Sequence, residues 1–215
     1  MKYKAVIFDL DGTLLNTLED LMDAVNYALT KYGYPARTLS EIRAFVGNGV
    51  RKLMERALPD GADNPQFELL LGTFRTYYTA HCEEKTHAYD GVIDLMEQLK
   101  AAGLKMAIVS NKLDSAVKDL NQSYFKDYVQ TAIGDKEGVR KKPAPDMVEQ
   151  ALLELQCEKK DTVYIGDSDV DIQTAANAGL ACISVSWGFR DASFLRECGA
   201  AVIADTPQEV FNLIS

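Results

Sequence analysis

Six short runs of apolar residues recur along the chain, and within each run the apolar positions are nearly continuous. This pattern is typical of strands that are covered on both faces of a sheet, whereas a half-exposed strand alternates apolar and polar positions. Between most of the runs, apolar residues repeat at helical spacing, as in Val92, Leu95, Met96 and Leu99. Strands that alternate with helices predict a doubly wound α/β fold with a parallel, Rossmann-like sheet. The predicted strands are residues 4–8, 105–109, 129–133, 162–165, 181–185 and 201–204.

Residues 16–89 interrupt this alternation, because they contain four stripes of apolar residues at helical spacing and no run that predicts a strand. A helical segment of this length after the first strand predicts a second, all-helical cap domain inserted into the α/β domain. We therefore expect an α/β core domain formed by residues 1–15 and 90–215, and a cap domain formed by residues 16–89. The four stripes begin at Leu18, Ile42, Leu53 and Phe67.

Polar side chains able to do chemistry follow four of the predicted strands, at the point where each strand ends. Each of them has an ordinary structural interpretation when taken alone, as a turn residue, a helix cap or a solvated charge. Because the carboxyl ends of parallel strands meet at one edge of a sheet, we expect the whole set to converge on one crevice. The set comprises Asp9 and Asp11, Ser110 and Asn111, Lys142, and Asp167 and Asp171.

Two of these carboxylates, Asp9 and Asp167, would repel each other if they faced one another across the crevice. A hard divalent cation with oxygen ligands removes that repulsion, and magnesium is the natural candidate because it accepts few carboxylates and keeps positions for water or phosphate. Lys142 and Ser110 then supply donors to the remaining oxygens of a bound phosphoryl group. The pattern therefore predicts a phosphoryl-transfer site that uses magnesium as its cofactor.

The composition limits the class of partner. The formal net charge is −9, with a pI of about 4.8, which argues against a nucleic-acid backbone or an anionic membrane surface as the main partner, since both require basic patches. We expect a small anionic metabolite instead. No stretch approaches the roughly 18 apolar residues of a membrane span. The apolar run after Lys4 is too short for a signal peptide, and the four cysteines are widely spaced, so we expect reduced thiols and a cytoplasmic location.

Four motifs resemble those of the haloacid dehalogenase superfamily, in the order and spacing of that superfamily. They are D-L-D-G-T at residues 9–13, S-N-K at 110–112, K-K-P-A-P-D at 141–146 and I-G-D-S-D-V-D at 165–171. The helical insert after the first strand is similar to the cap of that superfamily. Residues 46–58 and 185–190 look most like the phosphoglycolate phosphatase group. The resemblance thus implies a magnesium-dependent phosphomonoesterase, a phosphoric monoester hydrolase whose leading substrate is 2-phosphoglycolate.

The resemblance also implies a role for each motif residue. Asp9 would attack phosphorus and form an aspartyl-phosphate. Asp11 would protonate the departing alkoxide and later accept a proton from water. Ser110 and Lys142 would hold the transferring phosphoryl group. The metal ligands would be the side chains of Asp9 and Asp167 and the backbone carbonyl of Asp11. Supporting roles fall to Thr13, Asn111 and Asp171, the last of them acting on the metal shell through water or through Lys142.

Asp11 favours phosphate chemistry over dehalogenation, because a halide leaving group needs no proton. A phosphomutase or an inorganic pyrophosphatase on the same scaffold uses the same acids, so both remain alternatives. A non-catalytic binding or regulatory module is a further alternative, although such a protein is expected to have lost at least one of these residues. The chain is expected to act as a monomer or a homodimer.

The predicted cap contains one segment that suits an anion. Gly47, Asn48 and Gly49 precede a predicted helix that carries Arg51, and two glycines at a helix start expose backbone amides to a ligand. We expect these four residues to contact the non-phosphate end of the substrate, and the carboxylate of 2-phosphoglycolate would suit them.

Overall fold

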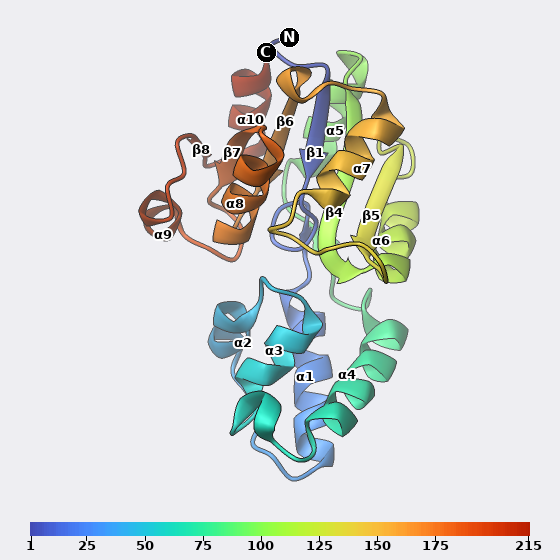
Figure 1. Cartoon of the computed structure of the whole chain (residues 1–215), viewed down its shortest axis with the longest axis vertical. Coiled ribbons are helices and arrows are strands. Elements are labelled where there is room, and N and C mark those ends of the chain that lie inside the picture. The colour runs from blue at the N-terminus through green and yellow to red at the C-terminus, as the bar shows by residue number, and fades with distance from the viewer. The chain divides into compact units, whose positions relative to one another are not determined.

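The computed structural model describes residues 1–215, and the chain separates into two compact units (Figure 1). The larger unit consists of Met1–Leu15 and Ala88–Ser215, and the smaller unit of Asn16–His87. The chain passes between them twice, within the two-residue strands β2 (Leu15–Asn16) and β3 (His87–Ala88), which pair with each other. None of the helices has the combination of length and hydropathy that crossing a bilayer requires.

The larger unit is built on a six-stranded parallel sheet with the strand order β5-β4-β1-β6-β7-β8. The chain therefore adds strands on one side of β1 first and on the other side afterwards. Open α/β sheets bind ligands at such a reversal, beyond the carboxyl ends of the strands. The strands are β1 (Ala5–Phe8), β4 (Lys105–Leu113), β5 (Thr131–Asp135), β6 (Thr162–Gly166), β7 (Ala181–Val185) and β8 (Ile203–Ala204).

Both faces of this sheet are covered, as the continuous apolar runs predict. In β1, Val6 and Phe8 belong to one buried apolar cluster, whereas Ala5 and Ile7 belong to another. This alternation follows from the two-residue period of a strand. The predicted doubly wound α/β fold class is therefore confirmed. The helices of the larger unit are α5 (Val92–Ala101), α6 (Asp114–Leu120), α7 (Asp146–Leu155), α8 (Asp169–Ala178), α9 (Ala192–Glu197) and α10 (Pro207–Ile214).

The smaller unit is helical, as predicted. Its helices are α1 (Leu18–Lys31), α2 (Leu39–Phe45), α3 (Val50–Ala57) and α4 (Phe67–His81). The apolar stripes are buried, including Val25 and Leu29 of α1 and Phe74 of α4. The rings of Tyr27 and Tyr77 stack with their centroids 4.2 Å apart, which adds an aromatic contact between α1 and α4.

A buried carboxylate ties the start of α1 to the end of the smaller unit. Asp20 accepts hydrogen bonds from the backbone N–H of Lys85 at 3.0 and 3.1 Å, from the N–H of Thr86 at 2.9 Å and from the Thr86 hydroxyl at 2.7 Å. Residues 85–86 lead directly into β3. The side chain of Asp20 therefore fixes the two linker ends of this unit to each other.

Candidate active site

Asp9 stands immediately after β1, where its backbone N–H donates to the Ile165 carbonyl of β6 at 2.8 Å. Its side chain is buried, and Oδ1 lies 2.7 Å from Nζ of Lys142. Burial raises the pKa of the Asp9 carboxyl well above its usual range, although the ammonium of Lys142 opposes that shift. A carboxylate in this position therefore needs a cation beside it to stay charged.

Lys142 is held by three acceptors, one for each proton of its ammonium group. Nζ lies 2.7 Å from Oδ1 of Asp9, 2.7 Å from Oδ1 of Asp171 and 3.0 Å from the Tyr164 hydroxyl. Burial lowers the pKa of Lys142, but the carboxylates of Asp171 and Asp9 outweigh it and raise the pKa well above its usual range. Asn111 fixes the backbone of Lys142 through bonds of 2.9 and 3.1 Å. The lysine is thus charged and immobilised.

Asp171 uses both of its carboxylate oxygens twice. Oδ1 accepts from Lys142 and from the Tyr164 hydroxyl at 3.0 Å. Oδ2 accepts from the backbone N–H of Ser168 at 3.2 Å and from its hydroxyl at 2.5 Å. The Ser168 hydroxyl in turn caps the first turn of α8. Asp171 therefore binds Lys142 directly, and its support of a metal through that lysine stays a prediction.

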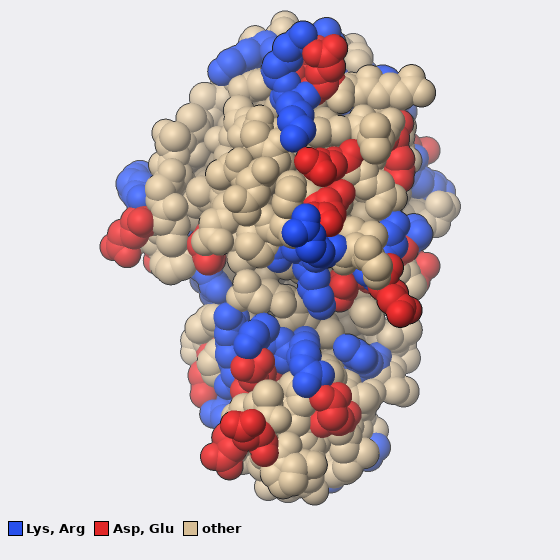
Figure 2. Space-filling model, in the orientation of Figure 1, with Lys and Arg blue, Asp and Glu red and all other residues tan.

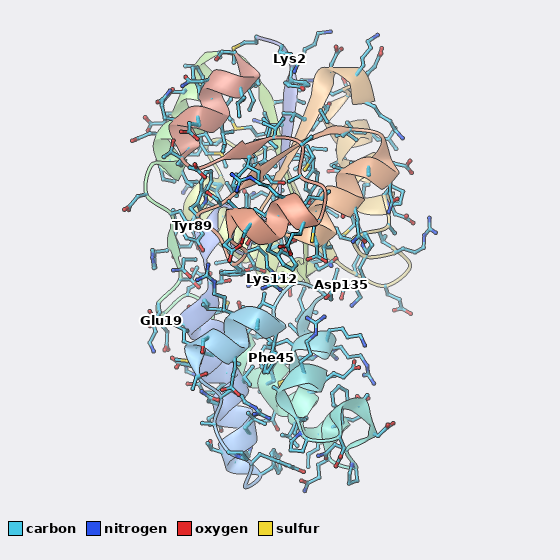
Figure 3. The ribbon with its side chains drawn as sticks, turned by 90° about the vertical axis from the view of Figure 1, so that its left-hand side faces the viewer. Lys2, Glu19, Phe45, Tyr89, Lys112 and Asp135 are labelled. Atoms are coloured by element: carbon cyan, nitrogen blue, oxygen red, sulfur yellow. The ribbon has the colours of Figure 1, made fainter.

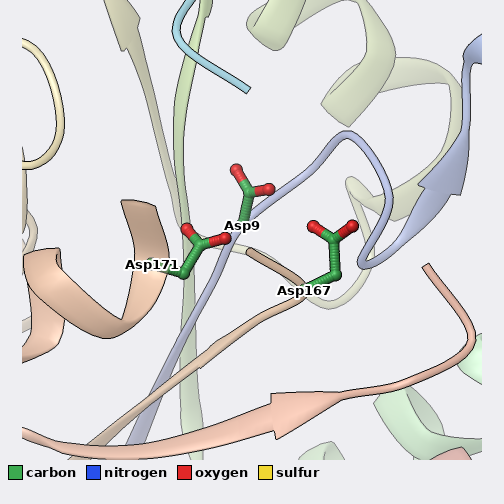
Figure 4. Close-up of side chains that lie close together, drawn as sticks. All are labelled: Asp9, Asp167 and Asp171. Carbon is green, nitrogen blue, oxygen red and sulfur yellow. The ribbon is translucent and has the colours of Figure 1, made fainter. Parts of the chain in front are cut away.

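Asp167 is placed by the turn that joins β6 to α8. Its Oδ2 accepts from the backbone N–H of Phe189 at 2.6 Å, and Thr13 donates its hydroxyl to Oδ1 at 3.4 Å. Burial, with the negative charge of Asp171 as a second cause, raises the pKa of Asp167 to about 7. The carboxyl groups of Asp9, Asp167 and Asp171 lie close together, with Asp9 between the other two (Figure 4).

These three carboxylates fit a divalent cation. One oxygen from each lies within 4.8 Å of the others, and all three side chains are buried. Lys112 and Lys142 bind three of the four motif carboxylates, and when all four carboxylates are ionised the set carries an excess of two negative charges. Oxygen donors with that excess suit a hard divalent ion.

Asp11 has its own lysine. Nζ of Lys112 lies 2.9 Å from Oδ1 of Asp11, and the side chains are 2% and 17% exposed, respectively. The backbone N–H of Lys112 donates to Oγ of Ser110 at 3.2 Å. Lys112 and Asp135 lie at the opposite end of the larger unit from Lys2 (Figure 3). The structure therefore brings Ser110, Asn111 and Lys112 to the same strand ends as the acids.

Thr13 and Trp187 complete the surroundings of the first motif. Thr13 is fully buried, and its carbonyl accepts from Nε1 of Trp187 at 3.0 Å. This bond ties the turn after β1 to the loop after β7. Thr13 thus contacts both Trp187 and Asp167, and its orienting role stays a prediction.

The predicted cap residues lie in the smaller unit, where they have partners of their own. Gly49 precedes α3 with a φ of 82°, a conformation that favours glycine. Oδ1 of Asn48 accepts from Arg56 at 2.7 Å, and Arg51 forms an ion pair of 2.7 Å with Glu68.

Sequence reasoning missed three side chains that organise the site. Tyr164 lies within an apolar run that predicts a buried strand, although its hydroxyl bridges Lys142 and Asp171. Lys112 belongs to the S-N-K motif, but that motif alone does not predict its bond to Asp11. Ser168 stands three residues before an acid at a helix start, and that spacing indicates a capping box.

Three comparisons with known proteins identify the family. The sequence profile of the haloacid dehalogenase-like hydrolases matches residues 6–185. The chain belongs to this family. It is 30% identical to phosphoglycolate phosphatase 1 of Pseudomonas aeruginosa, over 96% of this chain and 78% of that protein. It is 35% identical to phosphoglycolate phosphatase of Rhodobacter capsulatus, over 86% of this chain and 85% of that protein.

A crystal structure from Lactobacillus delbrueckii subsp. bulgaricus, provisionally named a phosphoglycolate phosphatase, matches this fold with a TM-score of 0.96. The two chains are 39% identical, and the match covers 100% of this chain and 99% of the other. The predicted membership of the superfamily and the resemblance to its phosphoglycolate phosphatase group are therefore confirmed. The haloacid dehalogenase-like hydrolase described here is, as predicted, a phosphoric monoester hydrolase.

Proposed function

We propose that this protein hydrolyses small phosphate monoesters with magnesium as its cofactor, through an aspartyl-phosphate formed on Asp9, and that 2-phosphoglycolate is its substrate. The observation that carries the proposal is the pairing of each working carboxylate with a buried lysine. Asp9 lies 2.7 Å from Lys142, and Asp11 lies 2.9 Å from Lys112. A nucleophile and an acid that are separately fixed suit an in-line displacement at one phosphorus atom.

In the proposed reaction, a carboxylate oxygen of Asp9 forms a bond to phosphorus while the bond from phosphorus to the ester oxygen breaks. Asp11 gives its proton to that departing oxygen. Water then attacks the aspartyl-phosphate, Asp11 accepts the proton from water, and orthophosphate and free Asp9 result. Ser110 and Lys142 hold the phosphoryl oxygens during both steps.

Magnesium, when bound, neutralises charge on the phosphoryl oxygens and on the carboxylates that hold it. We assign its binding to the side chains of Asp9 and Asp167 and to the backbone carbonyl of Asp11. Asp171 is left out of the ligand set because each of its oxygens already accepts two hydrogen bonds, one oxygen from Lys142 and Tyr164 and the other from Ser168. Its role is to hold Lys142.

The proposed substrate rests on the relatives, two of which are named phosphoglycolate phosphatase. Besides its phosphate group, 2-phosphoglycolate has a carboxylate, which the cap domain could bind as a second anionic group. We assign that recognition to Gly47, Asn48, Gly49 and Arg51.

The experiment that tests the mechanism replaces the nucleophile. Asp9→Asn is expected to lower kcat for an aryl phosphate by at least about 10³-fold, which corresponds to about 4 kcal/mol of transition-state stabilisation. Treatment of the unmodified protein with EDTA should also abolish turnover, and added magnesium should restore it. The matched control is Asp161→Asn, since Asp161 forms an ion pair with Lys4 and lies before β6, at the other end of the strands. Activity retained by Asp9→Asn would refute the mechanism.

A substrate panel tests the specificity. Specificity constants for 2-phosphoglycolate, a hexose 1-phosphate and pyrophosphate separate a phosphatase from a phosphomutase or a pyrophosphatase. We expect 2-phosphoglycolate to give the highest value. If no compound of a broad panel releases phosphate in the presence of magnesium, the protein is a binding or regulatory module.

A further inference from the structure

We propose that Lys112 is a positioning residue for the acid–base carboxyl of Asp11, which it holds through Oδ1. This inference rests on the proposed function, in which Asp11 protonates the leaving group. The S-N-K motif alone does not predict a separate role for Lys112, because a lysine side chain is usually solvated.

Burial is the first argument for this role. The Lys112 side chain is only 2% exposed, and a lysine is almost never buried to this extent unless it is paired. Its Nζ lies 2.9 Å from Oδ1 of Asp11. The dehydration of an ammonium group costs several kcal/mol, which only a fixed anion at short range offsets. Lys112 is therefore buried beside Asp11, the residue that transfers the proton in the proposed reaction.

The backbone of β4 directs this side chain inward. The pairing of β4 with β5 shifts register between Val109 and Leu113, a β-bulge or a similar irregularity of the strand. In a regular strand, successive side chains point to opposite faces, but a bulge redirects them. Ser110, Asn111 and Lys112 are consecutive, and all three are buried. The register shift thus coincides with three consecutive polar residues that are all buried.

The two buried lysines bind different carboxylates. Lys142 binds Asp9 and Asp171, whereas Lys112 binds Asp11. The three protons of Lys142 are all donated to Asp9, Asp171 and Tyr164. None of these three bonds goes to Asp11, and the buried lysine that contacts Asp11 is Lys112.

The chemical consequence concerns the leaving group. When the bond from phosphorus to the ester oxygen breaks, an alkoxide is too basic to depart without the proton of Asp11. A phenolate with strong electron-withdrawing groups departs without it. If Lys112 orients Asp11, its removal must harm alkyl phosphates far more than activated aryl phosphates.

The test compares kcat/KM for 2-phosphoglycolate and for 4-nitrophenyl phosphate in Lys112→Met. This ratio reports the steps up to departure of the leaving group. We expect the loss for the alkyl ester to exceed the loss for the aryl ester by about tenfold or more, the scale of a misplaced general acid. Lys112→Gln keeps a donor without the charge and should lie between the wild type and Lys112→Met. The matched control is Lys118→Met, because Lys118 is 60% exposed and pairs with Asp114 on the surface of α6.

A loss of equal size for both esters, or no loss, would overturn the proposal. If Lys112→Met does not fold, as judged by circular dichroism, Lys112→Gln takes its place in the same comparison. The double variant Asp11→Asn/Lys112→Gln gives a second test. Once the acid Asp11 is absent, replacing Lys112 should no longer change the ratio of kcat/KM between the two esters. Failure of the proposed function looks different, because the wild type would then hydrolyse neither ester.

Discussion

Two glycines give the Asp167 carboxyl the space it occupies. A Cβ atom on Gly12 would lie 2.3 Å from Oδ2 of Asp167. A Cβ atom on Gly188 would lie 2.2 Å from the Gly12 carbonyl and 2.5 Å from Cβ of Asp167. Neither approach is compatible with the present position of the carboxyl, so these positions require glycine for close packing.

Gly188→Ala is therefore expected to displace Asp167. A shift of about 1 Å in a reacting constellation costs about 10²-fold in rate, and we expect a loss of that size in kcat together with weaker magnesium binding. Steady-state assays over a range of magnesium concentrations measure both effects. The control is Gly72→Ala in α4, where a Cβ atom would meet nothing within 4 Å. That variant should keep its activity and gain about 0.5–1 kcal/mol of helix stability. Full activity of Gly188→Ala would contradict the packing argument.

The Tyr164 hydroxyl lies at the centre of a charged network, where it accepts from Lys142 and donates to Asp171. Burial and the charge of Asp171 raise the pKa of Tyr164 well above its usual range, so the phenol stays protonated and remains a donor. Tyr164→Phe leaves one proton of a buried ammonium without an acceptor. We expect the free energy of unfolding to fall by about 1–3 kcal/mol, measured by urea denaturation.

Tyr128→Phe is the matched control for this change. The Tyr128 hydroxyl donates to Glu97 at 3.2 Å on the exposed surface, where water replaces a lost partner. We expect its effect to stay below about 0.5 kcal/mol. If the two tyrosine variants lose equal stability, the hydroxyl of Tyr164 has no special role in the network.

For single residues, the sequence predicts which aspartates lie at the strand ends, but it does not predict the side chains that form hydrogen bonds within the cluster. Asp9 and Asp167 follow apolar runs, so their position at the strand ends could be foreseen. The hydroxyl of Tyr164 could not, because its neighbours Val163 and Ile165 make the run read as ordinary core. An aromatic ring fits such a run whether or not its polar atom has a partner.

Among the elements, α1 and the segment before β3 depend on a single carboxylate. Asp20 satisfies the backbone N–H groups of Lys85 and Thr86 as well as the Thr86 hydroxyl. Asp20→Ala leaves these donors without their acceptor in a buried place, and we expect it to cost about 3 kcal/mol of stability. Urea denaturation followed by circular dichroism measures the loss.

Asp23→Ala provides the comparison for Asp20→Ala. Asp23 also belongs to α1 and binds Lys85, but through an exposed ion pair of 2.6 Å. Exposed pairs contribute about 0–1 kcal/mol, so this variant should be nearly as stable as the wild type. A larger loss for Asp23→Ala than for Asp20→Ala would show that the linker ends are not held by the buried carboxylate.

The elements themselves were largely predictable, and the departures have local causes. The strand Ala181–Val185 matches its predicted bounds, because an apolar run there ends at polar residues. The strand Lys105–Leu113 runs four residues beyond its predicted end, since the polar residues Ser110, Asn111 and Lys112 are buried and continue the strand through a shift of register. The linker strands β2 and β3 have two residues each, too few to show any period.

The whole molecule is acidic, yet its surface is mixed. The net charge is −9, and basic and acidic side chains are interspersed on the face shown in Figure 2. The charged groups of the candidate active site are instead buried at the strand ends, where the four motif carboxylates lie near Lys112 and Lys142. Such a cluster couples the stability of the whole chain to pH and to magnesium.

The sign of this coupling follows from Asp167, whose pKa is raised to about 7 by burial and by Asp171. An aspartate in the unfolded chain has a pKa of about 3.9. Between these two values, the folded protein without metal holds a proton that the unfolded chain has released. Its free energy of unfolding therefore falls as pH rises from about 4 to about 7, and the loss is complete above that range.

Magnesium requires the charged carboxylate, so it competes with that proton. The rise in Tm on adding saturating magnesium is expected to be small near pH 5.5 and large near pH 8, because each displaced proton weakens binding about tenfold per pH unit below pH 7. Thermal melting at both pH values, with magnesium and with EDTA, measures the difference. Asp167→Asn removes one titrating group and should weaken both the pH dependence and the response to magnesium, whereas Asp9, whose pKa burial also raises, keeps part of each. An equal rise in Tm at both pH values would mean that the ion does not displace a proton from this carboxyl.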